Sequence, residues 1–309
     1  MRFRRLAAIA VLVGTVGATT AAALPPAPID RLQPLPDLTA RALAARYTAS
    51  AHQISQVTSA AKRAGDTSLV RALNGLRGQH FLDFNPSGQG LAVEVVGDLA
   101  TATRVAILVP GSDTSLATFG SRGTASPEGG AAALAAQARE LDPGTHLAVI
   151  AWLGYATPAT FSPGVLTSGD ARQGARALRW FAGELTRDGR QVALLCHSYG
   201  SVVCGLAAPH LPVADIAAFG SPGMDASSAR SLHSPARVWA CRGTEDLIGN
   251  VPHVQILGLG FGQDPTAPAF GARTFSCGDA NHSGYLRQGS VSLRNLAYIA
   301  LGDPAGVTR

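Results

Sequence analysis

The stretch that most constrains this chain is residues 192–206, VALLCHSYGSVVCGL, where an apolar run breaks at CHSYG and a second apolar run follows at once. This pattern predicts a buried strand, one tight turn and a helix, with Ser198 at the apex of the turn. Such a turn lifts the serine hydroxyl above the end of a sheet and needs small residues two positions away on either side. Gly200 meets that need, and Cys196 stands where a glycine is usual. We hypothesise that Ser198 is a nucleophile; the alternative is a buried strand–turn–helix with an incidental serine.

Backbone groups near this turn are candidates for stabilising a negatively charged oxygen. The N–H of Tyr199 lies at the start of the predicted helix and faces the same space as the hydroxyl of Ser198. Residues 104–109 form a near-continuous apolar run, typical of a buried parallel strand, and lead into Pro110, Gly111 and Ser112. A loop with an early glycine after a central strand is the usual place for a second donor. We assign that role to the backbone N–H near Ser112, and a plain Pro-Gly turn is the alternative.

The amino-terminal residues 1–23 have a basic start, a short apolar middle and a small-residue ending, which together predict a secretory signal peptide. The apolar run is shorter than the roughly 20 residues that a bilayer span needs, although an uncleaved anchor is the alternative. We expect a secreted chain with no stable membrane span after processing. Without the three arginines of this segment, 22 basic residues face 20 acidic ones, so the net charge falls from +5 to +2. The remaining basic residues are scattered, which gives no reason to expect nucleic acid as a partner.

The rest of the sequence predicts one α/β domain. Residues 24–36 are a proline-rich leader, and residues 37–309 are long enough for a single large core. Apolar spacing predicts a helical preface over residues 37–80. After it, predicted strands alternate with predicted helices, which implies a largely parallel sheet with helices on both faces. The strands are expected at 91–96, 104–109, 147–152, 192–195, 215–219, 236–241 and 273–277, and the helices at 129–141, 170–186 and 293–301.

A serine hydroxyl becomes a good nucleophile only when a base takes its proton and a carboxylate orients that base. Both partners must lie on loops at the sheet edge that carries Ser198. His282 follows the last predicted strand and is the candidate base, whereas His197 is expected to pack because successive side chains around a turn diverge. Asp246 follows the preceding strand and is the candidate acid, with Glu245 as its rival. We favour Asp246 because two apolar residues come directly after it.

Four cysteines in an exported chain indicate disulfides, although the sequence leaves three connectivities open. Cys241 and Cys277 each precede a candidate catalytic residue, the acid and the base, by five positions. If their strands are parallel neighbours in register, a disulfide between them would join the two catalytic loops. Cys196 and Cys204 bracket the serine turn, and they are either a second pair or two buried thiols. The spacing C-x-x-C is absent, so we expect no zinc site, and nothing implies another metal or an organic cofactor.

The order serine, acid, histidine along the chain is the α/β-hydrolase order. With these residues in place, the chain resembles a family of largely uncharacterised bacterial α/β-hydrolases with the elbow G-H-S-Y-G, from which it departs at Cys196. The resemblance covers roughly residues 80–302 and is more specific than the elbow alone because several motifs coincide. The matching motifs are VPG at 109–111, WLGY at 152–155, HSYG at 197–200, GSPG at 220–223, FGAR at 270–273 and HSGY at 282–285.

The resemblance implies an α/β-hydrolase fold and a serine hydrolase with Ser198, Asp246 and His282 as its triad. The expected substrate is a small-molecule or lipid ester, or a related acyl compound. One alternative is an exported acyltransferase that passes the acyl group from the same acyl-enzyme to an alcohol. Another is a non-catalytic binding protein that retains the fold. The acyl length, the leaving group and the oligomeric state stay open at this point.

Overall fold

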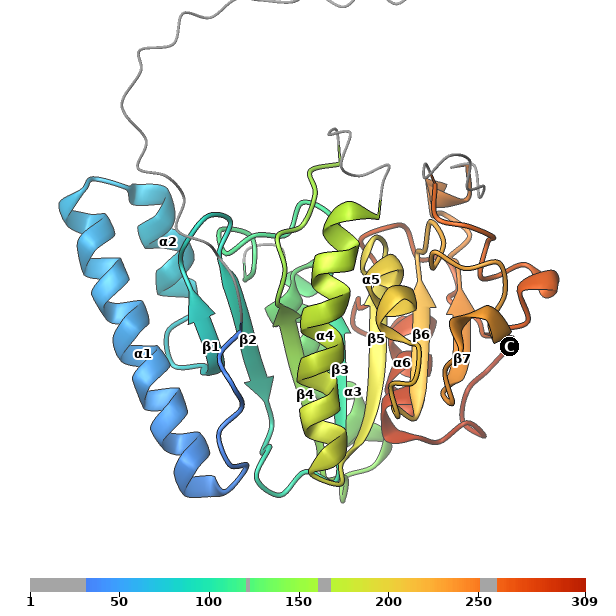
Figure 1. The fold of residues 1–309 in the computed structure, drawn as a ribbon, viewed down its shortest axis with the longest axis horizontal. Coiled ribbons are helices and arrows are strands. Elements are labelled where there is room, and N and C mark those ends of the chain that lie inside the picture. The colour runs from blue at the N-terminus through green and yellow to red at the C-terminus, as the bar shows by residue number, and fades with distance from the viewer. Residues whose placement is uncertain (1–31, 121–122, 161–167, 251–259) are drawn as a thin grey trace, which may run out of the picture.

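The computed structural model describes residues 32–120, 123–160, 168–250 and 260–309 (Figure 1). The predicted signal peptide and most of the proline-rich leader lie outside these residues.

The described chain is built around an eight-stranded sheet with the order β1-β2-β4-β3-β5-β6-β7-β8 (Figure 1). Strands β3 to β8 run parallel to one another, whereas β2 pairs antiparallel with β4 on one side and with β1 on the other. The predicted class, a mostly parallel α/β-hydrolase sheet, is therefore confirmed. The strands are β1 (His80–Asn85), β2 (Leu91–Val96), β3 (Arg104–Val109), β4 (Leu147–Leu153), β5 (Gln191–His197), β6 (Asp215–Phe219), β7 (Arg237–Cys241) and β8 (Arg273–Thr274).

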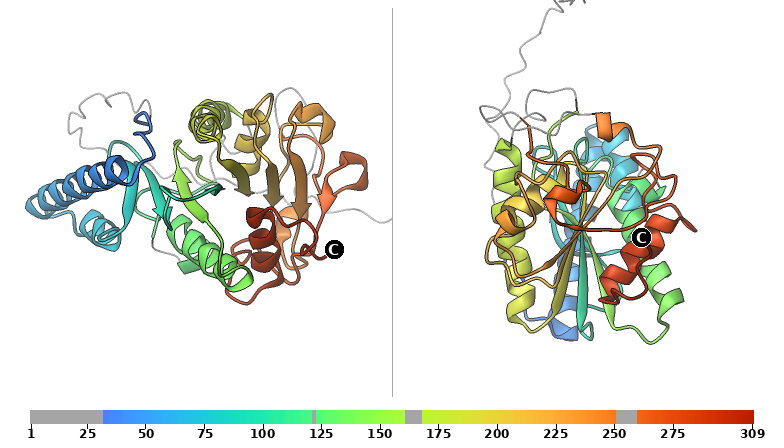
Figure 2. Two further views of the ribbon diagram at one scale, coloured as in Figure 1. Left: turned by 90° about the horizontal axis from the view of Figure 1, so that it is seen from below. Right: turned by 90° about the vertical axis from the view of Figure 1, so that its right-hand side faces the viewer.

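Helices cover both faces of the sheet (Figure 2). The helices α4 (Gly169–Arg187) and α5 (Gly200–Ala207) pack on one face, and α3 (Pro127–Leu141) and α6 (Val291–Leu301) pack on the other. At the β1 end of the sheet, α1 (Ala40–Arg63) packs against β1 and against α2 (Thr67–Gly75). The central strands are buried on both sides, which explains why their sequences read as continuous apolar runs.

The helix ends follow from local sequence chemistry. Side chains of Thr39, Asp66, Ser126 and Ser290 accept hydrogen bonds from the first-turn N–H groups of α1, α2, α3 and α6, as N-caps do. At the other end of α6, Gly302 adopts the left-handed conformation that commonly ends a helix.

Two predicted elements differ from the structure. The helical preface ends earlier than expected, because residues 80–85 form β1, an antiparallel strand that pairs with β2. The predicted last strand at 273–277 is reduced to the two residues of β8. Phe275 still bonds β7 through its backbone N–H, but the chain then turns away to bond Thr308 near the carboxyl terminus.

The parallel strands bring several loops to one edge of the sheet. The register pairs Val109 with Cys196, and it pairs His197 with Phe219, which in turn faces Cys241. The segments that follow β3, β5, β6 and β7 therefore begin at about the same level. This carboxyl-terminal edge is where ligands bind in open α/β sheets.

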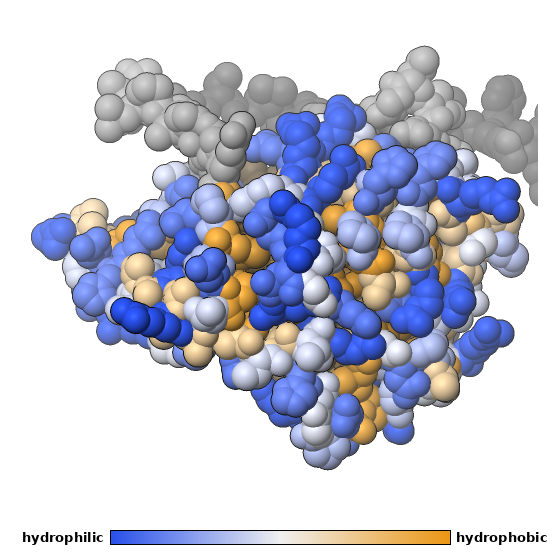
Figure 3. All heavy atoms as spheres, turned by 60° about the horizontal axis from the view of Figure 1, so that its bottom comes forward, coloured by the Kyte–Doolittle hydropathy of each residue, from blue (hydrophilic) through white to orange (hydrophobic). Residues whose placement is uncertain are grey.

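Polar side chains dominate the face of the molecule that Figure 3 draws, and its hydrophobic residues lie in small separate groups. Across the described residues, none of the helices combines the length and the apolar character that a membrane span needs.

Candidate active site

Ser198 lies at the apex of the turn between β5 and α5, in a backbone conformation with φ of 52° that non-glycine residues rarely adopt. Close packing around the turn keeps the backbone of Ser198 in this unfavourable conformation. A Cβ added to Gly200 would lie 2.5 Å from the carbonyl oxygen of Val109, and one added to Gly111 would lie 2.7 Å from the Cβ of Ser198. The backbone N–H of Ser198 also donates to the carbonyl of Phe219 at 3.0 Å. The turn therefore has the geometry of a nucleophile elbow.

A disulfide closes this elbow. Cys196, in the position where the usual motif has glycine, bonds Cys204 of α5 with a Cα–Cα distance of 6.4 Å. Both cysteines are completely buried. The open question about this pair is thus answered by the structure: the side chain at 196 is directed toward the helix, where it links strand and helix around Ser198.

The three predicted catalytic side chains form a continuous chain of hydrogen bonds. Nε2 of His282 lies 2.9 Å from Oγ of Ser198, and Nδ1 of the same ring lies 3.0 Å from each carboxylate oxygen of Asp246. Because an ionised carboxylate only accepts, Nδ1 carries a proton, and in the neutral ring Nε2 is then free to accept the serine proton. The Asp246 side chain is fully buried, whereas the imidazole is 40% exposed toward the pocket.

The environment of Asp246 keeps it ionised. Burial by itself would raise the pKa of this carboxyl, but hydrogen bonds from His282, Tyr285 and the N–H of Ile248 outweigh burial and lower the pKa. The rival acid, Glu245, is exposed, and the bond to the imidazole is made by Asp246 instead.

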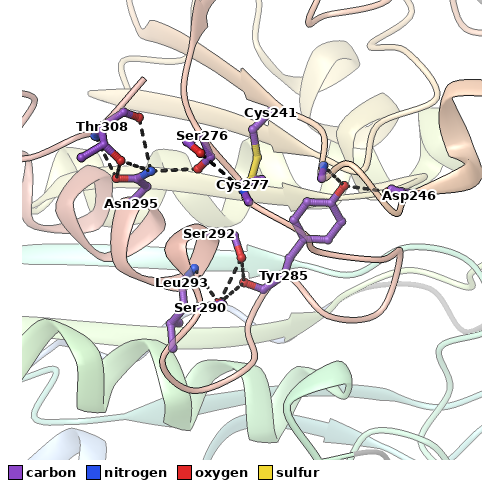
Figure 4. The surroundings of a disulfide bond; sticks show 12 residues. Cys241, Asp246, Ser276, Cys277, Tyr285, Ser290, Ser292, Leu293, Asn295 and Thr308 are labelled. Carbon is purple, nitrogen blue, oxygen red and sulfur yellow. Dashed lines mark hydrogen bonds between the residues drawn. A yellow bond between two sulfur atoms is a disulfide. The ribbon is translucent and has the colours of Figure 1, made fainter.

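We call the loop that follows β7 and carries Asp246 the acid loop, and the loop that follows β8 and carries His282 the base loop. These two loops are joined at several points (Figure 4). Cys241 and Cys277 form the expected disulfide, with a Cα–Cα distance of 5.9 Å. The sequence argument for this disulfide assumed that the two cysteines lie at matching positions on neighbouring strands, and that was wrong. The register pairs Trp239 with Arg273 and Ala240 with Thr274, and Cys277 lies three residues beyond the end of β8. The loop after β8 instead folds back to bring Cys277 beside Cys241.

Close backbone approach reinforces this junction. The N–H of Thr244 donates to the carbonyl of Gly278 at 3.0 Å. A Cβ on Gly243 would lie 2.0 Å from the carbonyl oxygen of Ala280, so only glycine fits there without a shift. The acid loop and the base loop are therefore packed as one unit.

His197 packs beside the triad, as expected, and also bonds it. Its Nε2 lies 2.7 Å from the backbone carbonyl of His282, and since a carbonyl only accepts, this nitrogen carries the proton. Burial, together with the neighbouring imidazole of His282, lowers the pKa of His197 to about 4, so the ring is neutral near pH 7. The residue before the nucleophile thus holds the backbone of the base.

The GSPG segment, residues 220–223, packs against the side chains of the site. Gly220 has φ of 58°, and a Cβ there would lie 2.9 Å from the ring of Tyr285 and 3.0 Å from Oδ2 of Asp246. One residue later, the hydroxyl of Ser221 bonds that of Ser201 in α5 at 2.6 Å. Sequence reasoning assigned no role to either residue, although both lie in a motif that carried the family resemblance.

Side chains of the segment after β4 fix the backbone of the loop after β3 by hydrogen bonds. The hydroxyl of the buried Tyr155, from the WLGY motif, donates to the carbonyl of Pro110 at 2.8 Å. The side chain of Thr157 accepts from the N–H of Thr114 and donates to its carbonyl. This support fixes the approach of Gly111 to Ser198, and it places Ser112 in the wall of the pocket.

A pocket of about 580 Å³ opens over Ser198. Apolar side chains make up much of its wall, and the hydroxyl of Ser198 and the imidazole of His282 lie in it. At its margin Leu247 is 77% exposed. The apolar lining residues are Leu108, Pro110, Ala125, Pro127, Phe219, Pro222, Leu247, Ile248, Phe261 and Leu286.

Chemically, this arrangement provides a hydroxyl whose proton can pass to a neutral imidazole, with a buried carboxylate behind it. In the part of the chain that the structure describes, no group of three or more His, Cys, Asp or Glu side chains is placed to hold a metal ion.

Comparison with known proteins agrees with the fold. The sequence profile of a family described as alpha/beta hydrolase matches residues 85–256. The chain belongs to this alpha/beta hydrolase family.

Its relatives include uncharacterised mycobacterial proteins. The uncharacterized protein Rv2079 of Mycobacterium tuberculosis is 33% identical over 256 residues, which cover 70% of this chain and 37% of that protein. The uncharacterized protein Rv0963c of the same organism is 32% identical over 170 residues, covering 52% of this chain and 63% of its own length. This chain thus spans less than two thirds of the length of either relative.

Among solved structures, esterase LipW from Mycobacterium marinum matches with 16% identity and a TM-score of 0.40, covering 90% of this chain and 96% of that one. A serine hydrolase without lid from Xanthomonas campestris, XC6422, matches with 16% identity and a TM-score of 0.45, covering 73% and 94%. The fold assignment rests on the sheet topology and the family match rather than on these two likenesses.

Proposed function

We propose that this protein is a secreted serine hydrolase that cleaves an ester or a related acyl bond through an acyl-enzyme. The observation that carries the proposal is the unbroken series of contacts from Oγ of Ser198 through the ring of His282 to Asp246, at 2.9 and 3.0 Å. The strained backbone of Ser198 at the carboxyl-terminal edge of the sheet supports it further.

In the first half of the reaction, Oγ of Ser198 attacks the carbonyl carbon of the ester while its proton passes to Nε2 of His282. Asp246 orients the ring and stabilises the imidazolium that forms. The N–H groups of Tyr199 and Ser112 stabilise the oxyanion, and loss of one such donor typically costs about 100-fold or more in rate. As the tetrahedral intermediate collapses, the carbon–oxygen bond to the alcohol breaks and His282 protonates the leaving oxygen.

In the second half, a water molecule attacks the carbonyl of the acyl-enzyme, and Nε2 of His282 takes one of its protons. Collapse of this second intermediate breaks the bond to Oγ of Ser198, which recovers its proton from the ring. The products are a carboxylic acid and an alcohol, and the side chains return to their starting protonation states.

The pocket favours a substrate with an uncharged, apolar acyl group. Side chains such as Leu108, Leu286 and Phe261 offer apolar contact area, and burying apolar surface yields roughly 25 cal/mol per Å². Its volume of about 580 Å³ lies within the range of small-molecule sites. A small-molecule or lipid ester with an apolar acyl chain fits these properties.

Location outside the cytoplasm is consistent with the covalent chemistry of the chain. All four cysteines are joined in disulfides, which form and persist in oxidising compartments. Export through the predicted signal peptide at residues 1–23 remains part of the proposal.

A panel of p-nitrophenyl esters of graded acyl length tests the proposed function. We expect hydrolysis by the wild-type protein, and a loss of about 10⁴-fold or more in kcat for Ser198→Ala. Ser59→Ala is the matched control, because Ser59 lies on α1, where its hydroxyl bonds the carbonyl of Ser55 at the far end of the sheet. Equal activity in Ser198→Ala and the wild type would contradict the proposal.

A further inference from the structure

The phenol oxygen of Tyr285 lies between the acid loop and the base loop (Figure 4). Its O–H donates to Oδ2 of Asp246 at 2.7 Å, and the oxygen accepts from the backbone N–H of Gly243 at 3.0 Å. One hydroxyl thus binds the beginning of the acid loop and the carboxylate at its end. The residue is 2% exposed and comes three positions after His282, on the base loop itself.

The direction of these two bonds follows from the partners. A carboxylate only accepts, and a backbone N–H only donates, so the phenol must donate to Asp246 and accept from Gly243. Burial, followed by the bond to Asp246, holds the pKa of Tyr285 well above its usual value. The phenol therefore keeps its proton near pH 7, where the carboxylate of Asp246 is ionised.

The rest of Tyr285 is fixed by its surroundings. Its backbone carbonyl accepts a hydrogen bond of 2.6 Å from Ser292, in the first turn of α6, and a longer one from the capping residue Ser290. Its ring packs against Phe219 with a centroid distance of 5.4 Å, and against His197 at 5.9 Å. The hydroxyl is consequently held in one place relative to the sheet, and Asp246 is held with it.

We propose that Tyr285 is a positioning residue for the reaction, one that fixes the orientation of Asp246 and moderates the negative charge that this carboxylate presents to His282. A hydrogen bond to one carboxylate oxygen draws charge away from the contact with the imidazole. The inference rests on the proposed function, because it concerns how the base is tuned.

The direct test is Tyr285→Phe, which removes one oxygen and keeps the ring. Without the phenol, more of the charge of Asp246 faces the imidazolium and stabilises it, so the acid limb of the kcat/KM profile moves to higher pH. Loss of a hydrogen bond to a charged group also lowers kcat by about tenfold, with KM nearly unchanged. Burst titration of active sites ensures that these constants refer to folded enzyme.

The matched control is Tyr298→Phe on α6. Its ring contacts Arg294, and we expect an unchanged pH profile for this variant.

Replacement of Tyr285 by 3-fluorotyrosine keeps both hydrogen bonds and makes the phenol a stronger donor, so it tests the same point in a protein that retains the hydroxyl. Here the acid limb should move to lower pH, opposite to the shift in Tyr285→Phe. Opposite shifts would support the proposal. An unmoved acid limb in an active 3-fluorotyrosine protein would overturn it and leave the proposed hydrolase function intact. A wild-type protein inactive toward every ester would overturn both.

Discussion

The two disulfides enclose regions that hold the proposed catalytic side chains in different ways. The elbow, residues 196–204, is the end of a strand and the start of a helix, and its disulfide joins residues only eight positions apart. In the acid–base unit, residues 241–285, the described parts 241–250 and 260–285 are mostly loop, and the disulfide joins residues 36 positions apart. In the elbow, regular structure and steric contact already fix Ser198. In the acid–base unit, the disulfide, the phenol of Tyr285 and the contacts of Gly243 take the place of regular structure.

Removal of each disulfide is the strongest way to test this contrast. In the loop-closure account, a crosslink over 36 positions stabilises by about 4 kcal/mol, and one over eight positions by about 2.5 kcal/mol. We therefore expect the double variant Cys241→Ala with Cys277→Ala to lose more unfolding free energy, and more esterase activity, than Cys196→Ala with Cys204→Ala. Urea unfolding and ester hydrolysis measure the two effects, and each variant controls for the other. The contrast is wrong if the elbow pair proves the more costly to remove.

Crowding of the elbow backbone is tested by Gly200→Ala. The added Cβ would lie 2.5 Å from the carbonyl oxygen of Val109 and 2.6 Å from that of Pro110, so the turn has to shift. We expect a loss of about 1–3 kcal/mol in unfolding free energy and a marked fall in kcat.

Gly183→Ala is the matched control for that substitution. Gly183 lies within α4, where an added Cβ would meet no atom within 4 Å apart from its chain neighbours and the adjacent helix backbone, and alanine there should stabilise by up to about 1 kcal/mol. Similar behaviour of the two alanine variants would mean that the elbow is not sterically fixed.

The two regions also differ, by a smaller amount, in the pH at which their contribution to folding stability is lost. The pKa of His197, beside the elbow, is lowered from 6.5 to about 4, so unfolding takes up a proton within that window and stability falls as the pH drops through it. The pKa of Asp246 is lowered below its ordinary 3.8, so its contribution is lost only at still lower pH. His197→Asn should flatten the change between pH 6.5 and 4 by about 1–2 kcal/mol.

Denaturant titrations at a series of pH values measure this change. A slope between pH 6.5 and 4 that is the same in His197→Asn and in the wild type would show that another group is responsible.

The same contrast explains what the sequence could predict. The elbow is a local pattern, so the residues around Ser198 were enough to predict strand, turn and helix. Asp246 and His282 were chosen by their positions after strands, and the topology of the sheet brings the segments after those strands to the edge that carries Ser198.

The means by which the acid–base unit is held together could not be read in the same way. The reduction of β8 to two residues, the path of Cys277 back to Cys241 and the two bonds of Tyr285 depend on contacts between distant residues. The motifs GSPG and HSGY contain Gly220 and Tyr285, but their sequences alone do not show that Gly220 packs against Asp246 and Tyr285, or that the hydroxyl of Tyr285 bonds Asp246. Strand β1 was missed because its sequence, HFLDFN, is short and follows directly on a helical stretch.

The most direct measurement of the central claim is labelling with a fluorophosphonate, followed by mass spectrometry of the modified peptide. We predict a single adduct on Ser198 in the wild-type protein, no adduct in Ser198→Ala, and much slower labelling in His282→Ala because the hydroxyl has lost its base. A wild-type protein that stays unlabelled, or an adduct that forms equally well in Ser198→Ala, would contradict the account.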